Sequence, residues 1–207
     1  MFRNLLRPDN PLMITMTQIT DCIFLSLFWL CCCFPLVTAG AATAAMYDAV
    51  YHGFRKGDKH SWQRFFRSFR SNLKGSFASS VLFLMISFLL TKGAVYLWNQ
   101  AVYGNISWTL FAAGAFLIFV MIGILSILFP MHSRFDNSFA ALWSNTFRLG
   151  FAKLPLTLGL SAVNCISIFL CVRYVVPVSF LPALACLIGT LFLEPMFKPY
   201  MPTEDAA

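Results

Sequence analysis

The stretch Pro35–Lys74, PLVTAGAATAAMYDAVYHGFRKGDKHSWQRFFRSFRSNLK, is the part of the sequence around which the chain is organised. It follows a long apolar run and begins with a segment of small residues. A basic turn comes next, and the stretch ends with a segment that mixes aromatic and basic side chains. The rest of the sequence is mostly apolar, and we expect it to form membrane-spanning helices arranged around this stretch.

The composition is typical of a membrane protein. Of the 207 residues, 59% are apolar and only 11% are charged, whereas a soluble domain carries about 25% charged residues. Several apolar runs are as long as the roughly 20 residues that cross a hydrocarbon core about 30 Å thick. We therefore predict an all-α, polytopic transmembrane bundle that forms a single domain over residues 1–207.

The positive charges predict how the bundle is oriented. The formal net charge of +7 comes from Lys and Arg in the loops, and short cytoplasmic loops carry an excess of these residues. The charge therefore indicates membrane orientation and not a nucleic-acid partner. Five predicted spans cover residues 14–37, 75–98, 108–129, 154–176 and 178–194.

Residues 38–54 have two interpretations, a short additional span or a re-entrant segment. As a span, they bring the count to six and put both termini in the cytoplasm. In that arrangement 13 of the 15 basic residues are cytoplasmic, and Lys92 and Arg173 lie near the outer helix ends. We favour six spans for this reason, with five as the alternative.

Two segments, residues 55–74 and 131–153, are predicted to be cytoplasmic and amphipathic. In the first, a helical period of about 100° per residue separates an aromatic face from a basic one. This face pattern is typical of a helix that lies against anionic lipid headgroups or a partner protein. The alternative is that the rings pack against the protein's own bundle. The face residues are Trp62, Phe65, Phe66 and Phe69, opposite Arg64, Arg67, Arg70 and Lys74.

The start of the central stretch carries a motif of small and turn-forming residues. Small residues spaced four apart allow helices to approach closely in lipid, and the motif places them directly after a proline. Its candidate packing residues are Pro35, Thr38, Gly40 and Thr43.

The chain resembles the YesL family of small bacterial membrane proteins, a family with a domain of unknown function. The resemblance is carried by Phe34–Gly40, Ala41–Ala45, Trp62–Phe66 and Phe69–Lys74. It implies a bacterial plasma-membrane protein associated with carbohydrate uptake, with an ABC-type sugar permease as its partner. It provides no catalytic residue.

The sequence contains no catalytic or nucleotide-binding motif that we recognise. GxxxxGK[ST], HExxH and GxSxG are all absent, so ATP-driven transport by this chain alone is excluded. The seven cysteines lie in apolar runs, without a CxxC pair beside His, and a zinc site is not expected. We predict neither enzymatic activity nor a cofactor or metal.

Two acidic residues are candidates for a function within the membrane, because ionisable groups at membrane depth are costly. These are Asp21 and Asp48, which adjacent antiparallel helices would bring together near the inner leaflet. Two hypotheses follow. The first is an accessory or regulatory component of ABC-type sugar import, and the second is a small-solute transporter or channel. A closed core without a polar cavity would count against the second.

Overall fold

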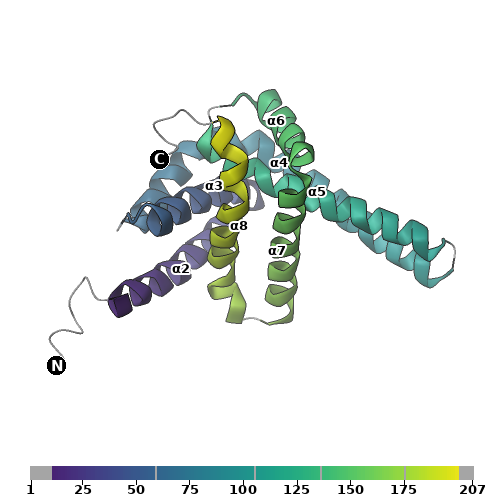
Figure 1. The fold of residues 1–207 in the computed structure, drawn as a ribbon, viewed down its shortest axis with the longest axis horizontal. Helices are drawn as coiled ribbons and strands as arrows, with labels where there is room; N and C mark the ends of the chain where they lie inside the picture. Colours follow the sequence, from purple (N-terminus) through teal and green to yellow (C-terminus); the bar gives the residue numbers. More distant parts are fainter. Residues whose placement is uncertain (1–10, 59, 105, 136, 175, 201–207) are drawn as a thin grey trace.

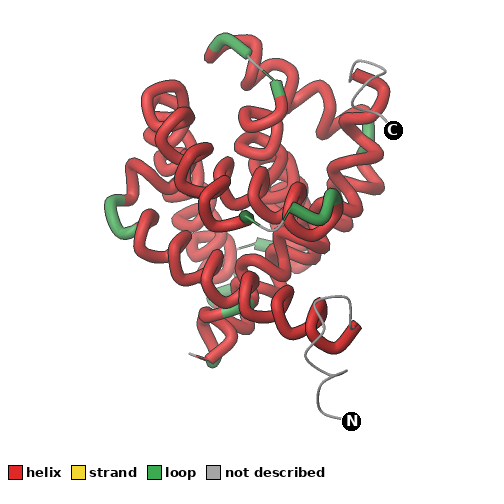
Figure 2. The backbone as a smooth tube through the Cα atoms, turned by 90° about the vertical axis from the view of Figure 1, so that its left-hand side faces the viewer, coloured by secondary structure: helices red, strands yellow, loops and turns green. Residues whose placement is uncertain are grey.

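The computed structural model describes residues 11–58, 60–104, 106–135, 137–174 and 176–200, and side chains within these ranges from Met16 onward. Within these ranges the backbone is almost entirely helical, the connections are short and there is no strand (Figure 2). The predicted all-α class is therefore confirmed. The two chain ends, which we expected to be cytoplasmic, lie outside the described residues.

Within the described ranges, five helices are long and apolar enough to cross a membrane. Each corresponds to one of the predicted spans, so the prediction of a multi-pass membrane protein is supported. Their apolar composition leaves many large side chains exposed, as expected for helices surrounded by lipid. The five are α2 (Pro11–Cys33), α4 (Ser61–Val102), α5 (Trp108–Arg134), α7 (Leu154–Arg173) and α8 (Leu181–Phe197).

The central helix α3 (Ala39–Val50) is not one of these five. With 12 residues it is about 18 Å long at 1.5 Å per residue, which is shorter than a hydrocarbon core of about 30 Å. Nine of its residues are buried. Its small side chains allow α2, α4, α5 and α8 to pack directly against it. α3 is therefore too short to be a span by itself, and it could cross the membrane only together with the helical turns on either side of it.

Short irregular turns flank α3 on both sides. A 3-10 turn, Leu36–Thr38, precedes it, and a π-helical turn, Tyr51–Arg55, follows it. Gly57 then adopts a φ of 71°, a conformation that residues with a side chain rarely adopt. These turns reverse the chain so that α4 runs back alongside α3 (Figure 1).

The first predicted amphipathic segment and the following span form one continuous helix. α4 runs for 42 residues without interruption, so residues 61–74 are its beginning and not a separate element. In the second amphipathic segment, α5 extends to Arg134 and is followed by α6 (Phe139–Ala152). The side chain of Ser138 accepts a hydrogen bond from the Ala141 amide and caps α6.

The long helices diverge from the region around α3. α2, the α4–α5 hairpin and the α7–α8 hairpin extend in three different directions (Figure 1). Two apolar clusters hold them together. One contains Tyr47, Phe129 and Phe197, and the other contains Val50 and Phe65. Because both clusters include α3 residues, α3 is the element against which α2, α4, α5 and α8 are packed.

Candidate functional site

α3 and the π-helical turn that continues it carry two pairs of polar or aromatic side chains, each spaced four residues apart. Residues at this spacing lie on the same face of a helix, so Tyr47 and Tyr51 share one face while Asp48 and His52 share the next. The partners of these pairs come from three other helices. We call the whole set the α3 polar junction: Tyr47, Asp48, Tyr51, His52, Arg64, Arg134 and Glu194.

The first half of the junction is centred on the Glu194 carboxylate. Arg134 Nη2 lies 2.8 Å from Glu194 Oε1, and the Tyr47 hydroxyl donates to the same oxygen at 2.6 Å. The guanidinium carbon of Arg134 also lies 3.6 Å from the centroid of the Tyr51 ring, a cation–π contact. The side chains of Arg134 and Glu194 are only 12% and 16% exposed. This half of the junction therefore joins α3, α5 and α8 by a largely buried ion pair.

The Tyr47 hydroxyl is the donor in its contact with Glu194, because an ionised carboxylate oxygen can only accept a hydrogen bond.

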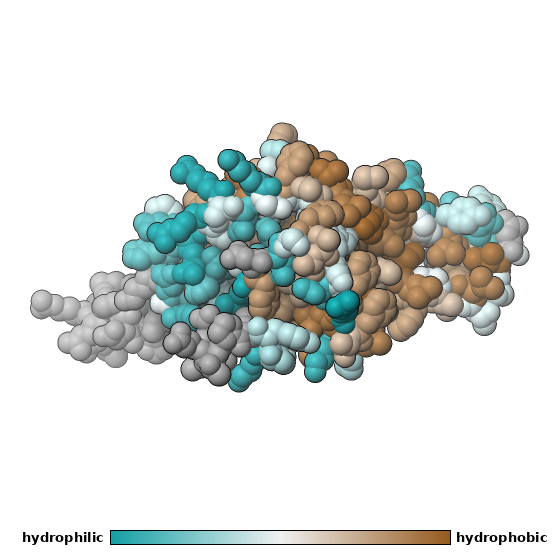
Figure 3. Space-filling model, turned by 90° about the horizontal axis from the view of Figure 1, so that it is seen from above, coloured by the Kyte–Doolittle hydropathy of each residue, from teal (hydrophilic) through white to brown (hydrophobic). Residues whose placement is uncertain are grey.

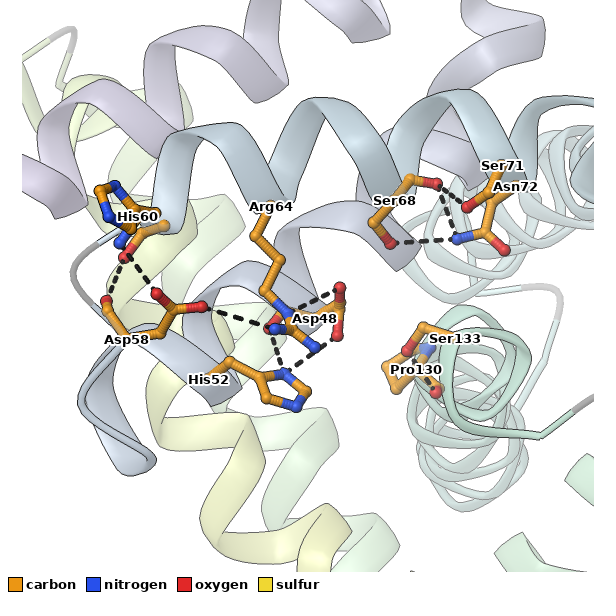
Figure 4. Close-up of polar contacts among 11 residues, drawn as sticks. Asp48, His52, Asp58, His60, Arg64, Ser68, Ser71, Asn72, Pro130 and Ser133 are labelled. Carbon is orange, nitrogen blue, oxygen red and sulfur yellow. Dashed lines mark hydrogen bonds and ion pairs between the residues drawn. The ribbon is translucent and has the colours of Figure 1, made fainter.

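The second half of the junction is centred on Asp48 (Figure 4). Arg64 Nε lies 3.2 Å from Asp48 Oδ2, and His52 Nδ1 lies 3.0 Å from Asp48 Oδ1. The side chains of Asp48 and His52 are each only 17% exposed, so this carboxylate meets its two partners in a largely buried setting. Arg64 also reaches Asp58 Oδ2, at 3.5 Å. Asp48 is therefore a carboxylate that fastens α3 to the beginning of α4.

A polar hollow lies next to this second half, between the start of α4 and the end of α5 (Figure 4). Its volume is about 300 Å³. Part of its wall is pre-ordered, because the Asn72 amide and the Ser71 hydroxyl both donate to the Ser68 carbonyl at 2.9 Å. The hollow presents carboxylate, guanidinium, amide and hydroxyl groups to a small polar ligand. It is lined by Asp48, Arg64, Arg67, Ser68, Ser71, Asn72, His132 and Ser133.

The motif residues predicted for packing lie at the join between α2 and α3. The Thr38 hydroxyl donates to the carbonyls of Cys32 and Pro35, which ties the end of α2 to the turn. Thr43 accepts a hydrogen bond from the Trp29 indole at 3.2 Å. Gly40 lies where a Cβ would overlap Ser80 and Phe129. These residues position α3 and do not enter the polar hollow.

The predicted aromatic face of α4 serves both interpretations, because some of its rings pack against the protein's own bundle and others remain exposed to lipid or a partner. Phe65 is fully buried and Phe69 packs against the same cluster, whereas Trp62 and Phe66 remain 50% and 38% exposed. Arg64 turns inward to Asp48. Three further basic side chains, Arg67, Arg70 and Lys74, are exposed.

The two acids predicted as candidates for a function within the membrane bind different residues of α4. The Asp21 carboxylate accepts a hydrogen bond from the Ser61 hydroxyl at 3.4 Å, while Asp48 binds Arg64 one turn later. The expected direct pairing of Asp21 with Asp48 is therefore replaced by contacts that both make with the start of α4.

Sequence reasoning did not assign a site to Tyr47, Tyr51, Arg134 or Glu194. The available signal was the pair of tyrosines four residues apart in a helix of otherwise small side chains. Their partners are 60 residues apart in the sequence and meet only in the folded chain.

Together the fold and the junction define a polytopic helical membrane protein whose buried polar groups meet around one short helix. Residues 22–93, about one third of the chain, match a family described as "Protein of unknown function, DUF624". The matched stretch includes α3 and about the first four fifths of α4. Comparisons with curated proteins and with solved structures give no match.

Proposed function

We propose that this protein is an accessory or regulatory component of carbohydrate uptake, which acts beside an ABC-type sugar permease in a bacterial plasma membrane. The resemblance of the central stretch to the YesL family supports this choice of partner. The way in which charged and apolar side chains are distributed over the structure supports the accessory role.

The observation that supports the proposal most is that the charged side chains gather at one end of the membrane-spanning helices. Among the described residues, charged side chains other than Lys92 and Arg173 lie near α3, in the first four turns of α4, around α6, at the inner ends of α5 and α8, or at Asp21. Figure 3 shows most hydrophilic side chains gathered towards the left of the view and hydrophobic ones over the centre and right, with some hydrophilic residues again at the right-hand tip. The positive-inside rule puts this charged end in the cytoplasm.

The charged end has an exposed surface suited to docking. Trp62 and Phe66 leave large parts of their rings accessible, and the basic side chains of Arg67, Arg70 and Lys74 are exposed on the same helix. Aromatic residues and Arg are enriched in the centres of protein interfaces. Bases at this position also meet anionic lipid headgroups, each contributing about 1 kcal/mol.

The arrangement of the acids favours this function over a transporter. Glu194 is paired with Arg134 and Asp48 with Arg64, so moving an ion or solute past these acids would require buried ion pairs to open. The polar hollow lies at the charged end, beside Arg67 and Asn72, and not along the length of the spans.

Affinity purification from the native membrane tests the proposal. The tagged chain would be extracted in a mild detergent, and co-purifying proteins would be quantified by mass spectrometry. We expect an ABC-type sugar permease in stoichiometric amount. The double variant Trp62→Ala/Phe66→Ala should reduce its recovery at least tenfold, because interface energy concentrates in buried aromatic anchors.

The matched control is Phe88→Ala/Phe116→Ala, which removes two exposed rings from the distal α4–α5 hairpin and should leave the recovery unchanged. Recovery of the chain alone, or an equal loss in both double variants, contradicts the proposal.

A further inference from the structure

An apolar groove runs between the long helices and reaches Tyr47 of the polar junction at its inner end. Its volume is about 410 Å³, within the range of ligand pockets. α7 and α8 form its two long walls, and α2, α3 and α5 close its inner end. Among its lining residues are Trp29, Leu125, Asn164, Val172, Ala185 and Leu193.

The groove offers little to a polar ligand, since none of its lining residues is charged. Its few polar side chains already use their donors within the protein. The Asn164 amide donates to the Leu160 carbonyl at 2.8 Å and to Ser126 at 3.2 Å. The Ser167 hydroxyl donates to the Val163 carbonyl at 2.7 Å. An apolar occupant therefore fits this chemistry better than a column of water.

The length of the groove matches one leaflet of a bilayer. Its lining extends from Leu160 to Val172 along α7 and from Pro182 to Leu193 along α8, which is roughly 18 Å of helix in each case. Half of a hydrocarbon core is about 15 Å thick. Both walls belong to helices that are long and apolar enough to cross the membrane, so lipid chains have access to the groove.

We propose that the groove holds one acyl chain of a membrane phospholipid. The chain enters at the outer end, beside Val172 and Val178, and its tip reaches Leu193 near Tyr47. Arg173 follows Val172 in the sequence and is exposed at this outer end, with its guanidinium carbon 5.8 Å from the Tyr174 ring. Its charge is placed to contact the lipid phosphate.

Retention of this lipid depends on close packing. An acyl chain is already shielded from water in the bilayer interior before it enters the groove. The hydrophobic effect therefore contributes little to its binding. Contact with groove walls on several sides supplies the additional dispersion attraction. A side chain that fills the groove should therefore displace the lipid.

Native mass spectrometry of the full chain tests the inference. The protein would be reconstituted in vesicles of phosphatidylethanolamine and phosphatidylglycerol, extracted in mild detergent and analysed for retained phospholipid. We expect one retained molecule per chain. Ala185→Phe, which places a ring in the groove, should reduce retention at least tenfold. The matched control Ala94→Phe, at an exposed position of α4, should retain the lipid.

A second measurement keeps the inference testable if Ala185→Phe fails to fold. A phosphatidylglycerol with a photoreactive acyl chain would be crosslinked to the unmodified protein. We expect crosslinks at Asn164 and Cys186 inside the groove. Crosslinks only at the outward-facing Ile166 and Phe169, or no lipid retained by the folded chain, would overturn the inference. These results do not depend on whether a sugar permease co-purifies.

Discussion

The carboxylate of Glu194 receives two partners from different helices, Arg134 from α5 and Tyr47 from α3. Removing one member of a largely buried ion pair leaves the other charge without compensation, which costs about 3–5 kcal/mol. The tyrosine hydroxyl would lose its acceptor in the same step. At this scale, the energy that holds α3 to α5 and α8 is concentrated in a few atoms.

Glu194→Ala should lower the free energy of unfolding by about 3–5 kcal/mol, because Arg134 is then buried without its partner. Unfolding of the purified protein in detergent would measure the loss. The double variant Glu194→Ala/Arg134→Met should recover part of it, since both charges are absent. A double variant less stable than Glu194→Ala would contradict this account.

Gly40→Ala should destabilise the fold by about 1–3 kcal/mol, the usual cost of overpacking a core. A Cβ at this position overlaps the Ser80 hydroxyl and the Phe129 ring, so α4 and α5 must move away from α3. Gly93→Ala in α4 is the control, because a Cβ there meets nothing within 4 Å. That change should be neutral or stabilise the helix by up to about 1 kcal/mol. Equal thermal stability of the two variants would show that Gly40 is not a close contact.

At the scale of elements, the unusual features are the shortness of α3 and the length of α4. α3 has 12 residues, most of them small and buried. A helix this short is stabilised by packing against its neighbours more than by the helix propensity of its own residues. The first four turns of α4 provide much of this packing and also expose part of their aromatic face. The aromatic face of α4 therefore contributes side chains both to the core and to the exposed surface.

Phe65→Ala should cost about 3–5 kcal/mol, because it removes a fully buried ring and leaves a cavity. Trp62→Ala, three residues earlier and half exposed, should change stability by at most about 0.5 kcal/mol. Thermal unfolding of both variants in the same detergent would compare them. Similar losses would mean that Trp62 also packs against the bundle.

At the scale of the molecule, the number of crossings determines where the chain ends lie. Five crossings put the termini on opposite sides of the membrane. Six put them on the same side, and the sixth would be the continuous helical run Leu36–Arg55. Its 20 residues extend about 30 Å at 1.5 Å per residue, and protein rather than lipid surrounds most of α3.

Reporter fusions at each end would determine this topology. We expect both reporters in the cytoplasm, as the positive-inside rule predicts for Arg3 and Arg7 at the beginning of the chain. A fusion within the basic connection at Lys56 serves as the cytoplasmic control. An N-terminal reporter on the outer side, with the other two in the cytoplasm, would establish five crossings and contradict the expectation.

The sequence alone was sufficient for the class of fold and for the five helices long and apolar enough to cross a membrane. Apolar runs such as residues 108–129 indicate membrane crossing because their length must match the hydrocarbon core, and that constraint acts on each helix separately. The small residues around Gly40 also indicated close helix packing, since the absence of bulk is visible in the sequence itself. The aromatic face of α4 was visible too, as a periodic pattern.

Only the tertiary structure decided which residues of those patterns meet. The helical period puts Phe65 and Trp62 on the same face of α4. Packing against α2 and α3 nevertheless buries Phe65 completely, while Trp62 stays half exposed. The pairing of Arg134 with Glu194 joins residues that are 60 positions apart. Local spacing contains no information about such a contact, because it depends on how α5 and α8 approach α3. The apolar groove arises for the same reason, since it belongs to the space between helices and to none of them alone.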